Sequence, residues 1–204
     1  MSGLREHQME MRRVAIAEAA IELFHSQGFH ETTIEQIAKR AGVSSPTVFK
    51  YYGSKQEMLL EMLREADRRA VFDLRDVMDQ FEDPVDVMCQ LESLLISYSL
   101  EVLPAPLWAE LLPLLIGGEH EGLPEGYRQI NAALTQEIAG VLTALQRAGK
   151  LRADLDVEFA AFLLNDYSHL QLLRLVRSAK PDRQAHADQV RRVTRLLFEG
   201  MKAR

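Results

Sequence analysis

The sequence contains a single cysteine, Cys89, among its 204 residues. One cysteine excludes an intrachain disulfide framework and any zinc site built from several cysteines. No stretch approaches the ~18 consecutive apolar residues that a membrane span needs. The first ten residues include Arg5, Glu6, His7 and Glu10, and so lack the apolar core of a secretory signal. We therefore expect a cytoplasmic protein with no membrane partner.

Sequence motifs of the common enzyme classes are missing as well. There is no glycine-rich phosphate loop, zinc-protease helix or nucleophile elbow, and the Gly117-Gly118 pair lacks the lysine of a P-loop. The composition, with 47% hydrophobic and 26% charged residues, is typical of folded globular proteins. We expect no enzymatic activity, no cofactor and no metal site.

An excess of positive charge, common among nucleic-acid-binding proteins, is also lacking, since the net charge is −6. The acidic residues are unevenly placed, however. Residues 1–56 carry seven Lys and Arg against six Asp and Glu, whereas residues 57–204 carry seventeen against twenty-four. A polyanion would be repelled by the second part of the chain but not by the first.

Helical periodicity dominates the chain, and no run shows the alternation that marks a β-strand. Glycines and prolines divide it into about nine helical segments. The sequence therefore predicts an all-α fold. Besides two short helices between Thr33 and Tyr52, the predicted helices cover residues 10–27, 54–81, 83–103, 105–116, 124–148, 156–179 and 181–201.

The starts of the two short helices are marked by capping signals. Thr32-Thr33-Ile34-Glu35 is interpreted as a capping box, in which a threonine accepts a backbone N–H and Glu35 reaches back. Gly42 ends this helix. Ser44-Ser45-Pro46 then predicts a serine N-cap followed by proline in the first turn, where its missing N–H costs nothing.

Two short helices joined by a glycine turn and preceded by a longer helix have the layout of a helix-turn-helix, whose second helix enters the major groove of DNA. At about 100° per residue, Val48 and Tyr52 fall on one side of that second helix. Pro46, Thr47 and Lys50 cluster on the opposite side. This side is small, polar and basic, which suits contact with base edges and phosphates.

The run from Thr33 to Leu59, TIEQIAKRAGVSSPTVFKYYGSKQEML, closely resembles the DNA-binding signature of the tetracycline-repressor (TetR) family. The motif resemblance covers roughly residues 10–60, and beyond it chain length and helix number fit the family. It implies an N-terminal three-helix DNA-binding domain, residues 1–56, and a larger helical domain for effector binding and dimerisation, residues 57–204. It also implies a homodimer that binds an inverted-repeat operator on double-stranded DNA.

The resemblance implies roles for individual residues. Positions matching Ser45, Pro46 and Thr47 contact bases in the family. Positions matching Thr33, Phe49, Tyr51 and Lys55 contact phosphates. Phe49 stands where the family usually has tyrosine, so its ring has no hydroxyl to donate to a phosphate. The predicted DNA-binding residues are Thr33, Ser44, Ser45, Pro46, Thr47, Phe49, Lys50, Tyr51 and Lys55.

The last two helices carry more apolar surface than one monomer needs to bury. The segment 156–179 is apolar on more than one side, and 181–201 has an apolar stripe with arginines elsewhere. We expect both helices of each protomer to form a four-helix dimer contact. The predicted interface residues are Phe159, Phe162, Leu163, Leu170, Val190, Val193, Leu197 and Met201.

Bulky side chains on the middle helices predict an apolar cavity with a few polar groups. A small, mostly apolar effector is the expected ligand, and its release of the protein from DNA would make the protein a repressor. The candidate effector residues are Phe72, Met88, Cys89, Tyr98, Trp108, Leu111, Leu112 and Asn165.

Two other classes stay open. Glu22-x-x-His25 and Asp166-x-x-His169 have the carboxylate–imidazole spacing of a di-iron helical-bundle enzyme, although Glu22 lies about 140° from the apolar stripe of its helix. The other class is a DNA-binding activator or nucleoid-type protein without an effector. Metal analysis of the purified protein would distinguish the di-iron enzyme from a regulator. A change in DNA affinity on adding a ligand would distinguish a ligand-responsive regulator from a DNA-binding protein without an effector.

Overall fold

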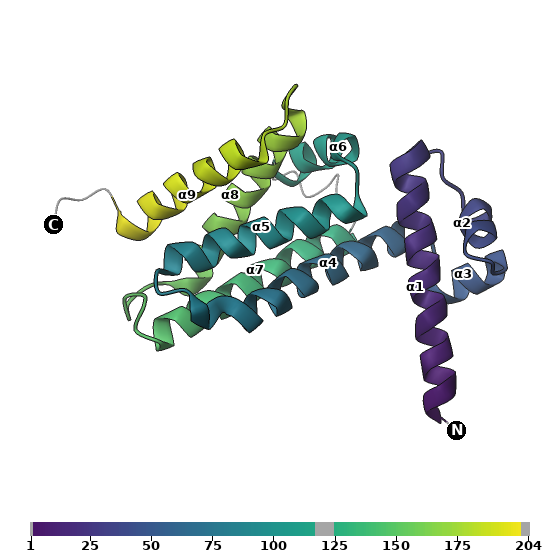
Figure 1. Ribbon diagram of the computed structural model, residues 1–204, viewed down its shortest axis with the longest axis horizontal. Coiled ribbons are helices and arrows are strands. Elements are labelled where there is room, and N and C mark those ends of the chain that lie inside the picture. The colour runs from purple at the N-terminus through teal and green to yellow at the C-terminus, as the bar shows by residue number, and fades with distance from the viewer. Residues whose placement is uncertain (1, 117–124, 201–204) are drawn as a thin grey trace.

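The computed structural model describes residues 2–116 and 125–200, and every regular element in these ranges is helical (Figure 1). The all-α fold predicted from the sequence is therefore confirmed. The elements are α1 (Ser2–Gln27), α2 (Ile34–Arg40), α3 (Ser45–Tyr52), α4 (Lys55–Val77), the 3-10 helix η1 (Met78–Gln80), α5 (Pro84–Val102), α6 (Ala105–Ile116), α7 (Glu125–Arg147), α8 (Val157–Arg177) and α9 (Arg183–Glu199).

Most helix ends lie within a few residues of their predicted positions, and α1 is the main exception. It begins at Ser2, eight residues before the predicted start at residue 10. The side chains of residues 6–10 are exposed, including that of Met9, so no buried stripe marks this part of the helix in the sequence. No helix within the described residues is long and apolar enough to cross a membrane.

The cap of α2 differs from the predicted capping box. Thr33, not Thr32, is the N-cap, and its partner is Gln36 rather than Glu35. The Gln36 N–H donates to Thr33 Oγ1 at 3.3 Å, and the Thr33 N–H donates to Gln36 Oε1 at 2.8 Å. Thr32 is buried and donates its hydroxyl to the Gly28 carbonyl oxygen at 2.7 Å, which removes it from the cap.

Helices α1, α2 and α3 form a small unit at one end of the molecule, which we call the head (Figure 1). Phe24 from α1, Ile37 from α2 and Val48 from α3 are fully buried at its centre. Together, side chains from the three helices bury enough apolar surface to hold them in one arrangement.

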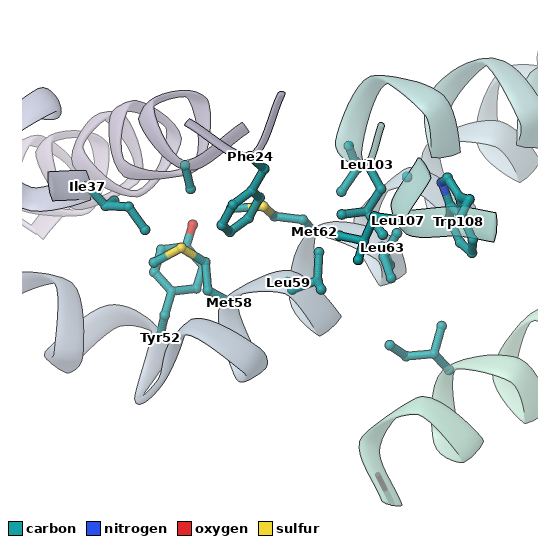
Figure 2. Packing of buried hydrophobic residues seen from close by; sticks show 14 of the residues in the cluster. Phe24, Ile37, Tyr52, Met58, Leu59, Met62, Leu63, Leu103, Leu107 and Trp108 are labelled. Atoms are coloured by element: carbon teal, nitrogen blue, oxygen red, sulfur yellow. The ribbon is translucent and has the colours of Figure 1, made fainter. Parts of the chain in front are cut away.

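Helix α4 runs from the head into the rest of the chain, which we call the body (Figure 1). Met58 and Met62 of α4 pack with the head side chains, and Leu63 continues the same cluster toward Leu103 and Leu107 (Figure 2). The cluster is continuous, so the head and the body share apolar contacts along one helix. A movement of α4 would therefore shift packed side chains in both the head and the body.

A second apolar cluster fills the far part of the body. It joins Val71 and Leu74 of α4 to Leu91 of α5 and to Leu142 and Leu145 of α7. Helix α8 packs against α6 and α7, and α9 packs mainly against α5. The body is thus a helical bundle with α9 along its outer edge (Figure 1).

Candidate functional site

Helix α3 is eight residues long, and its N-cap residue forms no capping hydrogen bond through its side chain. Ser44 has extended backbone angles but its side chain caps no backbone amide. Its hydroxyl lies 2.8 Å from the Thr47 hydroxyl, and one donates to the other. Both groups are on the surface of the head, where each can exchange this bond for one to a base or a phosphate.

The two sides of α3 are divided as the sequence predicts. Val48 is fully buried and Tyr52 is 9% exposed, so this side faces the head core. Pro46 and Lys50 are exposed on the other side, and Phe49 keeps 49% of its surface exposed. A short helix with one anchored side and one protruding, partly basic side has the geometry for a DNA groove.

Lys55 is placed differently from the phosphate contact that the motif implies. Its ammonium group donates to the carbonyl oxygens of Phe29 at 2.6 Å, Thr32 at 2.7 Å and His30 at 3.3 Å. It also lies 4.4 Å from the centre of the Phe29 ring. Partial burial lowers the pKa of this amine. In this structure Lys55 therefore ties the connection between α1 and α2 to the start of α4.

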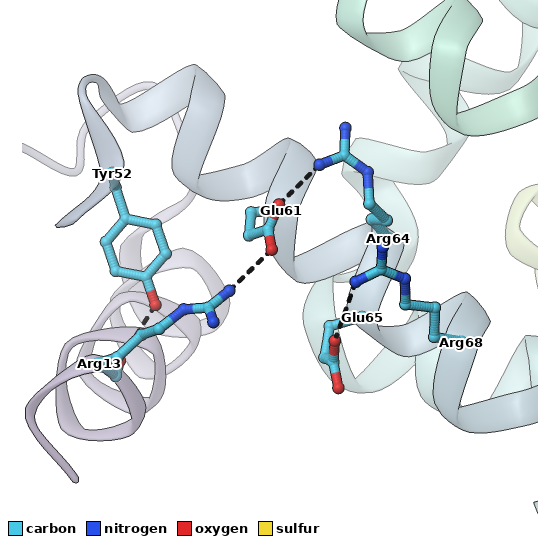
Figure 3. A network of polar contacts seen from close by, with 6 residues as sticks. All are labelled: Arg13, Tyr52, Glu61, Arg64, Glu65 and Arg68. Atoms are coloured by element: carbon cyan, nitrogen blue, oxygen red, sulfur yellow. Dashed lines mark hydrogen bonds and ion pairs between the residues drawn. The ribbon is translucent and has the colours of Figure 1, made fainter. Parts of the chain in front are cut away.

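A polar network fastens α1 to α3 and α4 (Figure 3). The Tyr52 hydroxyl donates to the Arg13 carbonyl oxygen at 3.1 Å. The Arg13 guanidinium donates to Glu61 Oε1 at 2.7 Å, and Arg64 donates to Glu61 Oε2 at 2.7 Å. Glu61 belongs to α4, so the orientation of α1 depends on the helix that continues into the body.

The remaining predicted DNA-binding residues lie on the same part of the head. Thr33 is exposed at the start of α2, and its oxygen accepts the capping bond while its hydroxyl hydrogen stays available. Ser45 and Tyr51 are partly exposed on α3. Together with the exposed face of α3, they form a polar surface around the turn between α2 and α3.

The predicted effector residues do not line one common cavity. Trp108 and Asn165 line an interior cavity between α4 and α8. Cys89 lines a cleft beside α9, and Tyr98 lines a cleft between the head and the body. Phe72 is 63% exposed on α4 and lines none of these three cavities. Met88, Leu111 and Leu112 pack in the apolar clusters.

The interior cavity brings together polar residues that the sequence did not predict as effector-binding residues. Asp67 of α4, Asn131 of α7 and His169 of α8 line it. Asn165 donates to Asn131 Oδ1 at 2.7 Å, and its own Oδ1 is buried without a hydrogen-bond partner among the described residues. Helical spacing could have indicated them, because residues four apart lie on the same face of a helix. Asp67 lies four residues after Leu63, and His169 lies four residues after Asn165.

Burial shifts the two titratable groups of this cavity toward their uncharged forms. It raises the pKa of the Asp67 carboxyl group to about 7 and lowers the pKa of His169 to about 4. Trp108 donates its indole N–H to the Ser99 carbonyl oxygen at 3.0 Å, which leaves the ring as an apolar wall. The cavity can thus hold an uncharged, largely apolar group with a polar end.

The predicted dimer residues lie on α8 and α9, and several have no apolar cover. Phe159 is 62% exposed, Phe162 53%, Leu163 40% and Leu197 41%. Leu170 and Val193 are partly buried. Val190 is only 4% exposed because it packs inward against its own chain. Met201 lies outside the described residues.

The residues of the metal-enzyme alternative make other contacts. Glu22 accepts two hydrogen bonds from Arg40 at 2.5 and 2.8 Å, and His25 lies 2.9 Å from the Glu101 carbonyl oxygen. Asp166 is on the surface, while His169 lines the interior cavity. Within residues 2–116 and 125–200, no group of three His, Cys, Asp or Glu residues is placed to hold a metal ion. The two carboxylate–imidazole pairs therefore do not form one metal site in the described part of the chain.

The head as a whole defines a helix-turn-helix DNA-binding unit carried on a helical body. The family described as "Bacterial regulatory proteins, tetR family" matches residues 16–62. The structure of FadR from Thermus thermophilus, a TetR-family transcriptional repressor in complex with lauroyl-CoA, is 32% identical to this chain. The comparison covers 94% of this chain and 96% of FadR, with a TM-score of 0.68.

Two other relatives are transcriptional regulators. The regulator TcmR of Streptomyces glaucescens is 34% identical over 86 residues, which are 42% of this chain and 38% of TcmR. The repressor NicS of Pseudomonas putida is 24% identical over 98% of this chain and 97% of its own. On the FadR comparison, which spans nearly both chains, this chain belongs to the TetR family of transcriptional regulators.

Proposed function

We propose that the protein is a ligand-responsive repressor that binds an inverted-repeat operator as a homodimer in the cytoplasm. Residues 1–56 contact the DNA, and residues 57–204 bind the effector and the second protomer. The observation that carries the proposal is the exposed face of α3, where Pro46 and Lys50 protrude while Val48 and Tyr52 anchor the helix. The family to which the chain belongs supports the same role.

The uncovered apolar side chains of α8 and α9 support the dimer. A two-fold axis beside these helices would bury Phe159 and Phe162 of both protomers in one four-helix contact. The heads would then be held as a pair. Two copies of α3 can meet successive major grooves only when this pair has the spacing of one helical turn of DNA, about 34 Å.

The apolar lining of the interior cavity supports a mostly apolar effector. The lauroyl-CoA bound to T. thermophilus FadR, which has a long apolar chain, supports the same chemistry. The cavity holds only about 40 Å³ in this structure, so the effector would bind a form in which the surrounding helices stand farther apart. Leu63 and Asp67 of α4 line it, while Met58 and Glu61 of the same helix contact the head. Binding there would shift the population toward a head spacing that does not fit DNA.

DNA binding is tested by fluorescence anisotropy with a duplex from the protein's own promoter. Thr47→Ala and Lys50→Ala should each weaken binding by about 1–3 kcal/mol, since each removes a base or phosphate contact. Lys50→Ala should also reduce the slope of log K against log salt by about one. Lys180→Ala removes an exposed lysine far from the head and should leave affinity unchanged. Full affinity in both head variants, with unchanged circular dichroism, would remove α3 from the interface.

The effector part is tested by adding lauroyl-CoA and other apolar metabolites to the same complex. A fall in DNA affinity with rising ligand concentration is expected, because the ligand stabilises the form with misplaced heads. No change with any member of the panel would instead support a DNA-binding protein without an effector.

A further inference from the structure

A separate cleft lies between α5, α8 and α9 in the body. It encloses about 390 Å³, a size typical of small-molecule sites. Ile96, Leu175 and Val190 give it an apolar wall, and Glu92 and His186 face it from α5 and α9. Ile96 also lines the interior cavity, so the two cavities share part of one wall.

Two polar atoms in this cleft are buried without a partner. Glu92 Oε1 and His186 Nε2 form no hydrogen bond within the described part of the chain, and their side chains are only 11% and 10% exposed. Leaving a buried polar atom without a hydrogen-bond partner is unfavourable, because the atom loses its bonds to water and gains none in return. The second carboxyl oxygen of Glu92, Oε2, accepts a hydrogen bond from the Ser168 hydroxyl. One oxygen of this carboxyl group therefore has a partner, and the other has none among the described residues.

The distance between the two unpaired atoms favours a third group between them. Glu92 Oε1 and His186 Nε2 are 3.9 Å apart, which is too long for a direct hydrogen bond. One donor atom can lie about 2.8 Å from both at the same time. A Glu92 carboxylate oxygen and an unprotonated His186 nitrogen at this separation could both accept a hydrogen bond from one donor group placed between them.

Within the described residues, His186 is the basic side chain within ion-pair distance of Glu92, and burial lowers its pKa. Arg191 forms an ion pair with Asp86 at the edge of the cleft, and no arginine or lysine ion pair to Glu92 is present in residues 2–116 and 125–200. Burial raises the pKa of Glu92 to about 7 and lowers that of His186. The cleft thus contains a buried carboxyl group that forms no ion pair with an arginine or lysine, beside an imidazole whose burial favours its neutral form.

We propose that this cleft binds a small primary amine, whose ammonium group donates to Glu92 Oε1 and His186 Nε2 and whose short apolar part packs against Ile96, Leu175 and Val190. An ammonium group has the two donors that this pair needs, whereas an alcohol has one. A quaternary ammonium group has none, and a carboxylate would be repelled by Glu92. The site lies outside the interior cavity, so it adds a second ligand to the proposed regulator.

Binding of the ammonium group converts the neutral Glu92 carboxyl group to a carboxylate, and the proton leaves to the buffer. Below pH 7 this releases up to one proton per bound amine. The other titratable or charged groups that line the cleft with Glu92 or lie beside it are Asp86 and Cys89 of α5, Tyr167 of α8, and Arg183, His186, Asp188 and Arg191 of α9, while α7 presents the apolar Ile138. Tyrosine, thiol and guanidinium groups keep their protons at this pH, and Asp86 is already ion-paired, so Glu92 is the expected source.

The test is isothermal titration calorimetry of the full chain with n-butylammonium chloride, at pH 6.5 in two buffers with different ionisation enthalpies. We expect saturable binding at one site per chain with proton release. Glu92→Gln should weaken binding about tenfold or more and abolish the release, because Gln cannot supply the negative charge. n-Butanol should bind about tenfold more weakly than the amine.

Control variants separate the site from the fold. Glu101→Gln changes an exposed carboxylate on the same helix α5 and should bind the amine as the unaltered chain does. Ser93 is exposed on the wall of the cleft, so Ser93→Trp should block the site without disturbing buried groups, and should abolish binding. No saturable binding, equal binding of n-butanol, or proton release that survives in Glu92→Gln would overturn the proposal. None of these measurements involves DNA, so they test the amine site independently of the proposed repressor function.

Discussion

Single side chains fix the head by donating hydrogen bonds to backbone carbonyl groups far away in the sequence. Lys55 donates to three of them in the connection between α1 and α2, and Tyr52 donates to the Arg13 carbonyl of α1. Carbonyl groups outside regular hydrogen bonding need such partners when they are partly buried. At these two positions a polar side chain stabilises the arrangement of the head through backbone carbonyl groups.

Replacing Lys55 distinguishes this role from a phosphate contact. Lys55→Met should lower the free energy of unfolding by about 1–3 kcal/mol, because it leaves three carbonyl groups without their charged donor. Urea unfolding followed by circular dichroism measures this change.

Lys50→Met serves as the matched control, since Lys50 is exposed on α3. It should leave the unfolding free energy within about 0.5 kcal/mol and reduce the salt slope of DNA binding instead. If Lys55→Met left stability intact and reduced the salt slope by about one, the contact implied by the family motif would be the correct one.

At the scale of helices, glycine has opposite effects at two positions. Gly53 ends α3 at a φ of +71°, a conformation that side chains with a Cβ atom rarely adopt, and this turn sets the angle between α3 and α4. Gly140 lies inside α7 on an exposed surface, where it only weakens the helix. A Cβ atom at Gly140 would meet nothing closer than the Arg75 guanidinium, at 3.9 Å.

These positions predict effects of opposite sign for the same substitution. Gly140→Ala should raise the free energy of unfolding by about 0.5–1 kcal/mol, as expected for glycine inside a helix. Gly53→Ala should lower it by about 1–2 kcal/mol, because alanine is strained at this positive φ. Both are measured by urea unfolding, and equal effects of the two changes would contradict the assigned turn.

At the scale of the whole molecule, exposed phenylalanines lie both on the proposed dimer surface and away from it. Phe162 on α8 is 53% exposed beside Phe159, whose ring centre is 6.4 Å away, and the exposed Leu163 follows it. Phe72 on α4 is even more exposed, at 63%, but lies on a different helix from the proposed interface. The two positions therefore form a matched pair for a test of assembly.

Phe162→Asp should convert the dimer to monomers, because it places a charge in a buried apolar contact. Phe72→Asp should leave the dimer intact. Size-exclusion chromatography with light scattering gives the mass of each variant, and DNA affinity should fall along with dimerisation in Phe162→Asp. A dimer that persists in Phe162→Asp and dissociates in Phe72→Asp would move the interface to α4.

Features that depend on neighbours in sequence were predictable. The two faces of α3 follow from helical geometry over eight residues, and the helix ends follow from glycines, prolines and capping residues nearby. The capping box of α2 was displaced by one residue because Thr32 turns to the Gly28 carbonyl, and two adjacent threonines give the sequence no means of choosing between them.

Features that depend on how helices lie against one another needed the tertiary structure. Cys89, Tyr98 and Asn165 all lie on apolar helical faces, yet they reach three different cavities because α5 and α8 have neighbours on several sides. Glu92 and His186 are 94 positions apart, and no local pattern links them. Local rules decide which side of a helix is apolar, whereas only the packed chain decides what that side, or a long side chain such as Lys55, will meet.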